Sequence, residues 1–159
     1  MNVILKNSVN EKVHFVNNNG LQLFFKREDK IHSIISGNKY RKLKFNLIKA
    51  KELGYKGLLT FGGAYSNHIP AVAYAANKHG FKSLGFIRGD ELVNNFLENS
   101  TLKYSHNLGM KFNFLSRSNY KKKTNENYVN SIKNRFKDYY FIPEGGTNAL
   151  GVLGCEEIL

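Results

Sequence analysis

Short apolar runs alternate with longer segments of helical pattern from residue 56 to residue 142. The apolar runs lie at residues 57–61, 83–87, 111–115 and 139–142. The helical segments between them lie at residues 66–79, 94–108 and 125–136. Successive runs begin about 27 residues apart, which is the length of one strand plus one helix. The pattern therefore predicts an α/β fold with an open parallel βαβ sheet and right-handed crossovers.

A β-hairpin is expected ahead of this block. Residues 12–16 and 21–27 have the pattern of two short strands. The residues between them, Asn-Asn-Asn-Gly at 17–20, tolerate the positive φ angles of a tight turn.

A helix is expected to follow the hairpin, at residues 38–53. Leu43, Leu47 and Ala50 supply its apolar side, and Gly54 is a suitable C-terminal stop. The parallel sheet is thus preceded by a hairpin and one helix.

Composition places the chain among globular proteins, with 42% hydrophobic residues and a mean hydropathy of −0.42. The longest apolar run, at residues 69–76, is far shorter than the roughly 18 residues of a membrane span, and residues 1–12 hold no apolar signal region. The single cysteine, Cys155, excludes an internal disulfide framework and fits a reducing compartment. We therefore expect a cytoplasmic protein with no membrane partner.

The net charge of +12 raises the question of nucleic-acid binding. The cations are spread along the chain, and the one run is Lys121-Lys122-Lys123, which we expect in a solvated loop or at a helix start. No groove-reading motif accompanies the charge. A nucleic-acid partner is therefore not expected, and a basic nucleic-acid-binding domain is the least favoured alternative.

A lysine stands at the start of the expected helix. Lys39 follows Gly37 and Asn38, and Lys42 lies one turn later on the same face. A helix N-terminus and a nearby cation both disfavour the ammonium form, so we expect the pKa of Lys39 to be lowered, as covalent catalysis by an amine requires. The alternative is an ordinary surface lysine.

Two glycine-rich turns follow predicted strands, at residues 62–68 and 143–148. In the first, Ser66 or Asn67 can cap the next helix, and in the second Asn148 can do so. Ligands of open α/β sheets bind outside the carboxyl ends of the strands, so both turns are candidate binding loops. The alternative is that they are plain strand-turn-helix connections.

The five histidines do not form a metal-ligand pattern. His68 and His79 share a helix face, but they stand about 16 Å apart at 1.5 Å per residue. No metal is expected. Cys155 is expected to be a small buried residue rather than a nucleophile.

Four motifs, in this order and spacing, resemble the 1-aminocyclopropane-1-carboxylate deaminase and D-cysteine desulfhydrase family. They are Lys26-Arg27-Glu28-Asp29, then Gly37-Asn38-Lys39-Tyr40-Arg41-Lys42-Leu43, then Gly62-Gly63-Ala64-Tyr65-Ser66-Asn67-His68, then Pro143-Glu144-Gly145-Gly146-Thr147-Asn148 with Gly151 and Gly154. The family's members are pyridoxal phosphate enzymes of the tryptophan synthase β-subunit-like fold. The resemblance implies a deaminase or desulfhydrase that acts on a small amino acid and releases ammonia and a keto acid, with sulfide as well from D-cysteine.

The resemblance also implies roles for individual residues. Lys39 would be the Schiff-base lysine, Lys42 a ligand of the cofactor phosphate, and Asn67 the neighbour of the pyridoxal 3-oxygen. Ser66 would face the substrate. Tyr65 stands where the family often has Gln, so the lining beside Ser66 differs from the common pattern.

Family members are about twice as long as this chain, and the resemblance implies a division into parts. Residues 1–42 would belong to the larger cofactor domain, 43–148 would form the smaller βαβ domain, and 149–159 would begin the return into the larger domain, where the chain stops within an expected helix. The full-length protein would be compatible with a homodimer. The alternative is a catalytically silent fragment or interaction module of the same fold.

Overall fold

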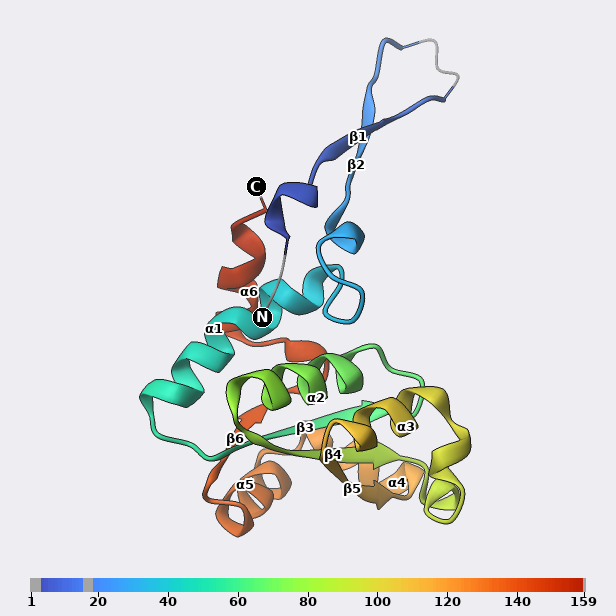
Figure 1. Ribbon diagram of the computed structural model, residues 1–159. Helices are drawn as coiled ribbons and strands as arrows, with labels where there is room; N and C mark the ends of the chain where they lie inside the picture. The colour runs from blue at the N-terminus through green and yellow to red at the C-terminus, as the bar shows by residue number, and fades with distance from the viewer. Residues whose placement is uncertain (1–3, 16–18, 159) are drawn as a thin grey trace.

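The computed structural model of the protein describes residues 4–15 and 19–158. At its centre is a four-stranded sheet with the order β5-β4-β3-β6, in which all neighbours pair in parallel (Figure 1). The strands are β3 Gly57–Gly63, β4 Lys82–Arg88, β5 Met110–Leu115 and β6 Tyr139–Ile142. The predicted open parallel sheet is confirmed.

The strand order changes direction at β3. The chain runs outward from β3 to β4 and β5, and then returns to place β6 on the other side of β3. Helices α2 (His68–His79) and α3 (Ser100–Asn107) cover one face of the sheet, whereas α4 (Arg117–Lys121) and α5 (Glu126–Arg135) cover the other (Figure 1). This reversal leaves the carboxyl ends of β3 and β6 next to each other at a topological switch point.

Both faces of the sheet bury apolar side chains. On one face, Leu58 and Ile87 of the sheet are buried together with Leu102 of α3. On the other face, Phe61 and Ile132 belong to a second, mostly aromatic cluster. The sheet is therefore covered on both sides, which explains why its strands appear as continuous apolar runs.

The prediction of a helix at residues 94–108 is wrong for the first half of that range. Residues Asp90–Leu92 and Phe96–Glu98 form two short 3₁₀ turns, and α3 begins only at Ser100. The cause is Asn99, whose side-chain oxygen accepts a hydrogen bond from the Leu102 N–H at 3.0 Å and so fixes the start of the helix.

The predicted hairpin is confirmed, but its first strand begins two residues earlier than expected and its second strand is shorter. Strands β1 (Asn10–Val13) and β2 (Leu23–Lys26) pair antiparallel and extend away from the parallel sheet (Figure 1). The turn expected at residues 17–20 falls partly outside the described residues. Apolar side chains of β2 face solvent, with Phe24 48% and Phe25 61% exposed. A 3₁₀ turn precedes the hairpin at Leu5–Asn7, and another follows it at Glu28–Lys30.

Helix α1 (Asn38–Glu52) has nearly the expected bounds and packs against α6 (Ala149–Glu156). Glycine makes this contact possible, because a Cβ on Gly154 would lie 2.0 Å from the carbonyl oxygen of Arg41. A 3₁₀ turn at Glu144–Gly146 connects β6 to this pair of helices. The last turn of the chain is thereby brought next to the start of α1.

The lysine run lies at the end of a helix, not in a loop or at a helix start as predicted. Lys121 closes α4, and Lys122–Thr124 continues as a 3₁₀ turn. Lys123 lies 3.2 Å from a carboxylate oxygen of Glu144 and 4.6 Å from the centre of the Tyr120 ring. Within the part of the chain that the structure describes, no helix is long and apolar enough to cross a membrane.

Candidate active site

Three turns that are distant in sequence meet near the switch point of the sheet. They are the start of α1, the turn from β3 to α2, and the turn after β6. A Cβ placed on Gly146, in the turn after β6, would lie 3.1 Å from Cβ of Lys42 in α1 and 3.8 Å from Cε1 of His68 in α2. Gly146 has a φ of 71°, which a side chain would strain. The close approach of the three turns thus depends on glycine.

Lys39 is nearly buried at the start of α1, with 9% of its surface exposed. Its Nζ donates a hydrogen bond to Oδ1 of Asn38 at 2.6 Å. Burial lowers the pKa of Lys39, and the positive charge of Lys42 lowers it further. The expected direction of the shift is confirmed, but its main cause is burial, which the helix-start argument did not include.

Lys42 lies one turn further along α1 and reaches the turn after β6. Its Nζ donates a hydrogen bond to Oγ1 of Thr147 at 3.0 Å. Asn46, one turn later, exchanges hydrogen bonds with Asn148, and Asn148 caps α6 through the Gly151 N–H at 2.8 Å. These contacts fix the turn after β6 against α1.

Ser66 and Asn67 lie in the turn that follows β3. Ser66 Oγ accepts a hydrogen bond from the His68 N–H at 3.2 Å, so Ser66 supports the start of α2. Asn67 is exposed, and its side chain makes no capping bond to the described backbone. Ser66 also lines a pocket of about 350 Å³ at the ends of β3 and β4, together with Arg88 and Glu144.

A buried histidine was overlooked as a site residue by the sequence argument, which considered histidines only as metal ligands. His68 is 1% exposed, and burial, with the charges of Lys39 and Lys42, lowers its pKa to about 3. Its Nδ1 has no hydrogen-bond partner among the described residues. The available signal was its place in the first turn of α2, directly before the apolar, alanine-rich run at residues 69–76.

Cys155 is half-buried on α6, rather than fully buried as expected. Cys155 lies within electrostatic reach of Lys39, because a negative charge on its sulfur would raise the pKa of the amine. The described part of the chain contains no group of three or more His, Cys, Asp or Glu side chains suited to a metal ion.

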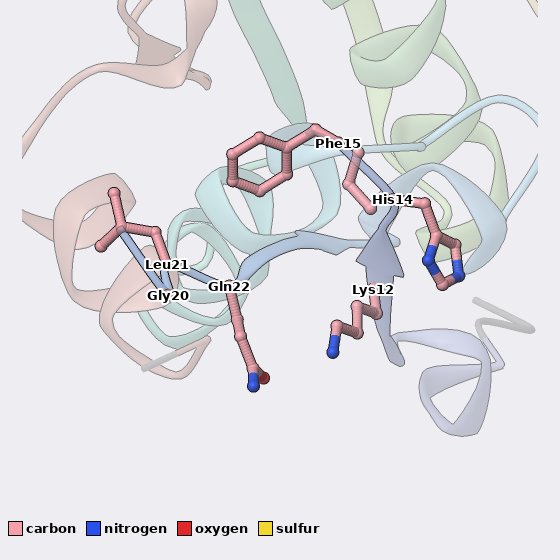
Figure 2. A pocket seen from close by; sticks show the side chains of 7 residues that line it. Lys12, His14, Phe15, Gly20, Leu21 and Gln22 are labelled. Carbon is pink, nitrogen blue, oxygen red and sulfur yellow. The ribbon is translucent and has the colours of Figure 1, made fainter. Parts of the chain in front are cut away.

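A hollow of about 600 Å³ also lies in the hairpin, between residues 12–15 and 20–22. Figure 2 shows that Lys12 and His14 point in different directions there, so these polar groups do not converge. The hollow is wide, but it lacks the buried polar groups that distinguish the switch point of the sheet. We therefore place the candidate site at the sheet and not at the hairpin.

The sequence was compared with protein-family models and with known proteins. No protein-family model matches the chain. A putative 1-aminocyclopropane-1-carboxylate deaminase of Thermotoga maritima is 36% identical over 138 residues, which cover 85% of this chain and 43% of the relative. A bifunctional D-cysteine desulfhydrase/1-aminocyclopropane-1-carboxylate deaminase of Arabidopsis thaliana is 32% identical over 145 residues, or 87% of this chain and 36% of the relative. The chain is therefore similar in sequence to deaminases and desulfhydrases of this family over at least 85% of its own length.

Solved structures are similar to the chain as well. A crystal structure described as an ACC deaminase homologue matches with a TM-score of 0.68 and 28% identity, over 87% of this chain and 42% of that one. A hydrogen sulfide-producing enzyme of Fusobacterium nucleatum shares the fold, with a TM-score of 0.59 at 13% identity. The chain spans less than half of the length of each of these relatives.

The residues at the switch point fit pyridoxal phosphate, the cofactor that the resemblance to this family implies. An aldehyde needs an amine that loses its proton readily, and burial gives Lys39 this property. A phosphate needs a cation at the site, and Lys42 supplies one in the second turn of α1. The roles of Lys39, Lys42, Ser66 and Asn67 remain predictions that the arrangement is compatible with.

Proposed function

We propose that the chain forms the Lys39 side of a pyridoxal phosphate site in a deaminase or desulfhydrase that acts on a small amino acid. The products would be ammonia and a keto acid, with sulfide as well if the substrate is D-cysteine. One observation carries the proposal: the Lys39 amine is buried, with a lowered pKa, where three glycine-containing turns meet at the switch point of a parallel sheet.

Each residue has a distinct task in this proposal. Lys39 attaches the cofactor and, once released, carries a proton to or from the substrate. Lys42 holds the phosphate, and Asn67 donates to a cofactor oxygen from the start of α2. Pyridoxal phosphate, when bound, supplies the electron sink for the charge that develops on the substrate's α-carbon.

Ser66 is assigned to the substrate. Its hydroxyl donates to the substrate carboxylate at the N-terminal end of α2, where negative charge is favoured. The neighbouring pocket of about 350 Å³ has room for a small amino acid, and its lining carries both signs of charge, from Arg88 and Arg117 and from Glu91 and Glu144. The carboxylate, which D-cysteine and 1-aminocyclopropane-1-carboxylate share, is the feature that this region is suited to bind.

The test is an assay of ammonia and sulfide release after incubation with pyridoxal phosphate and either D-cysteine or 1-aminocyclopropane-1-carboxylate. We expect turnover that Lys39→Arg abolishes, because arginine keeps the charge but cannot form the covalent bond. Ser66→Ala should lower turnover and leave the cofactor attached. Turnover that survives Lys39→Arg would contradict the proposal, and cofactor attachment with no turnover would support the silent-module alternative.

A further inference from the structure

His68 is a buried titratable side chain that the proposed function does not use. Its Nε2 lies 2.8 Å from Oγ1 of Thr60 in β3, and that Oγ1 donates a hydrogen bond to the carbonyl oxygen of Ile142 in β6 at 2.8 Å. The Nε2 side of the ring is therefore fixed by β3 and β6, the two strands whose carboxyl ends form the switch point.

This chain of hydrogen bonds fixes the tautomer. A threonine hydroxyl has one hydrogen, and Thr60 gives it to Ile142. Thr60 must then accept from His68, so the ring proton of His68 is on Nε2. Nδ1 consequently carries a lone pair and acts as an acceptor.

The acceptor is left without a partner. His68 Nδ1 is buried and makes no hydrogen bond with any described residue. A buried polar atom in this condition is destabilising unless a donor reaches it for part of the time. The site should therefore contain an N–H or O–H group that can move to Nδ1.

Two lysines on the adjacent helix are the candidates. The side chains of Lys42 and His68 flank Gly146, and Lys39 lies one turn before Lys42 on the same face of α1. The Lys42 amine is drawn to the exposed edge of the site by Thr147. The Lys39 amine is the more deeply placed of the two, and its bond to Asn38 occupies only one of three N–H donors.

We propose that His68 is a positioning residue that gives the Lys39 amine a second partner: Nδ1 of His68 accepts a hydrogen bond from Lys39 when the amine leaves Asn38. Asn38 and His68 thus define two positions between which the amine moves. The use of this movement in catalysis rests on the proposed function, but the hydrogen bond itself requires only the chain.

The charged surroundings are consistent with this role. The titratable groups that act on Lys39 are Lys42 on its own helix and Cys155 on α6, and the positive charges of Lys39 and Lys42 in turn lower the pKa of His68 on α2. Because burial keeps the pKa of His68 at about 3, the ring is neutral at pH 7 and adds no third positive charge to those of the two lysines.

Nitrogen-15 NMR of the histidine-labelled chain, without cofactor, tests the proposal at pH 7. We expect His68 to be protonated on Nε2 alone, and its Nδ1 resonance to move in Lys39→Met but not in the matched variant Lys42→Met. A proton on Nδ1, an unchanged resonance in Lys39→Met, or a change in Lys42→Met alone would overturn the proposal.

A second measurement follows the protonation of Lys39 instead of that of His68. The pH profile of Lys39 acylation, followed by peptide mass spectrometry, should move about one pH unit lower in His68→Leu, because the ammonium loses an acceptor. His68→Asn keeps an acceptor oxygen near the place of Nδ1 and should restore the profile. Equal acylation profiles in the wild type, His68→Leu and His68→Asn would contradict the proposal. If His68→Leu does not fold, the NMR comparison decides, and since no sample contains cofactor, the outcome is independent of the proposed function.

Discussion

The carboxyl edge of the parallel sheet and the N-terminal hairpin differ in what they bury. At the sheet edge, polar and ionisable side chains are buried, among them Lys39 and His68. In the hairpin, apolar side chains are exposed, with Phe25 61% accessible. Both arrangements depart from the usual pattern in proteins, in which apolar side chains are mostly buried and ionisable ones are mostly exposed.

The two regions depart from this pattern for different structural reasons. At the sheet edge, Thr60 holds His68 Nε2 and Thr147 holds the Lys42 amine, while the buried Nδ1 of His68 has no hydrogen-bond partner among the described residues. In the hairpin, the strands pair with each other and their side chains have little to pack against. Buried polar groups on a rigid sheet indicate chemistry, whereas the exposed hairpin contributes little to the stability of the described fold.

The strongest test of this contrast compares two phenylalanines. Phe61→Ala should lower the free energy of unfolding by about 3–5 kcal/mol, because Phe61 is 1% exposed in the aromatic cluster of the sheet. Phe25→Ala, the matched change in the hairpin, should alter it by less than about 0.5 kcal/mol. Urea denaturation measures both, and similar losses would remove the distinction between the two regions.

The buried histidine should make stability depend on pH. His68 has a pKa of about 3 in the folded protein, whereas an unfolded histidine titrates near 6.5. Its contribution is therefore fully present above about pH 6.5 and is lost as the pH falls from there toward about 3. The unfolding free energy of the wild type should decline over this range more steeply than that of His68→Asn, and parallel curves would show that His68 is not buried in the neutral form.

A buried ion pair next to the site provides the third comparison. Glu28 holds Arg41 through two hydrogen bonds, at 2.9 and 3.2 Å, and this contact anchors the first turns of α1. Glu28→Gln removes the buried counter-charge of the guanidinium, leaves only the more distant Glu157 at 3.4 Å, and should cost about 3 kcal/mol. Glu11→Gln, which changes an exposed pair of the hairpin, should cost much less.

The same pair predicts a change in acid stability. Arg41 lowers the pKa of Glu28 below its ordinary value, so the stabilisation is present above that ordinary value and is lost as the pH falls through the folded pKa. Glu28→Gln should lack this component in acid denaturation measured by circular dichroism. An acid profile identical to that of the wild type would contradict the assignment.

The smallest expected effect concerns the cofactor phosphate. Lys42→Ala should weaken pyridoxal phosphate binding by about tenfold to a hundredfold, because a charge-assisted contact is lost. Lys49→Ala, which removes an exposed lysine of the same helix, is the matched control. Equilibrium dialysis gives both affinities, and an equal loss in the two variants would argue against a specific role for Lys42.

The parallel sheet was predictable because its strands are covered on both faces and so form continuous apolar runs. The start of α1 and the spacing of Lys39 and Lys42 were also visible in the sequence. The 3₁₀ turns before α3 were not, because one side chain, Asn99, decides where that helix begins.

The burial at the site could not be predicted from local sequence. Lys39 is covered by contacts that depend on α6 and on the turn after β6, more than 100 residues away. The acceptor role of His68 depends on Thr60 and Ile142, which only the strand order brings together. The division into domains and the roles of Ser66 and Asn67 remain predictions.

The most direct test of the central claim is to map where pyridoxal phosphate attaches. The chain is incubated with the cofactor, reduced with borohydride, digested and analysed by mass spectrometry. We predict that the label is on Lys39, that the exposed Lys49 of the same helix is unlabelled, and that Lys39→Arg removes the label. Label on Lys49, or label spread evenly over the surface lysines, would contradict the account.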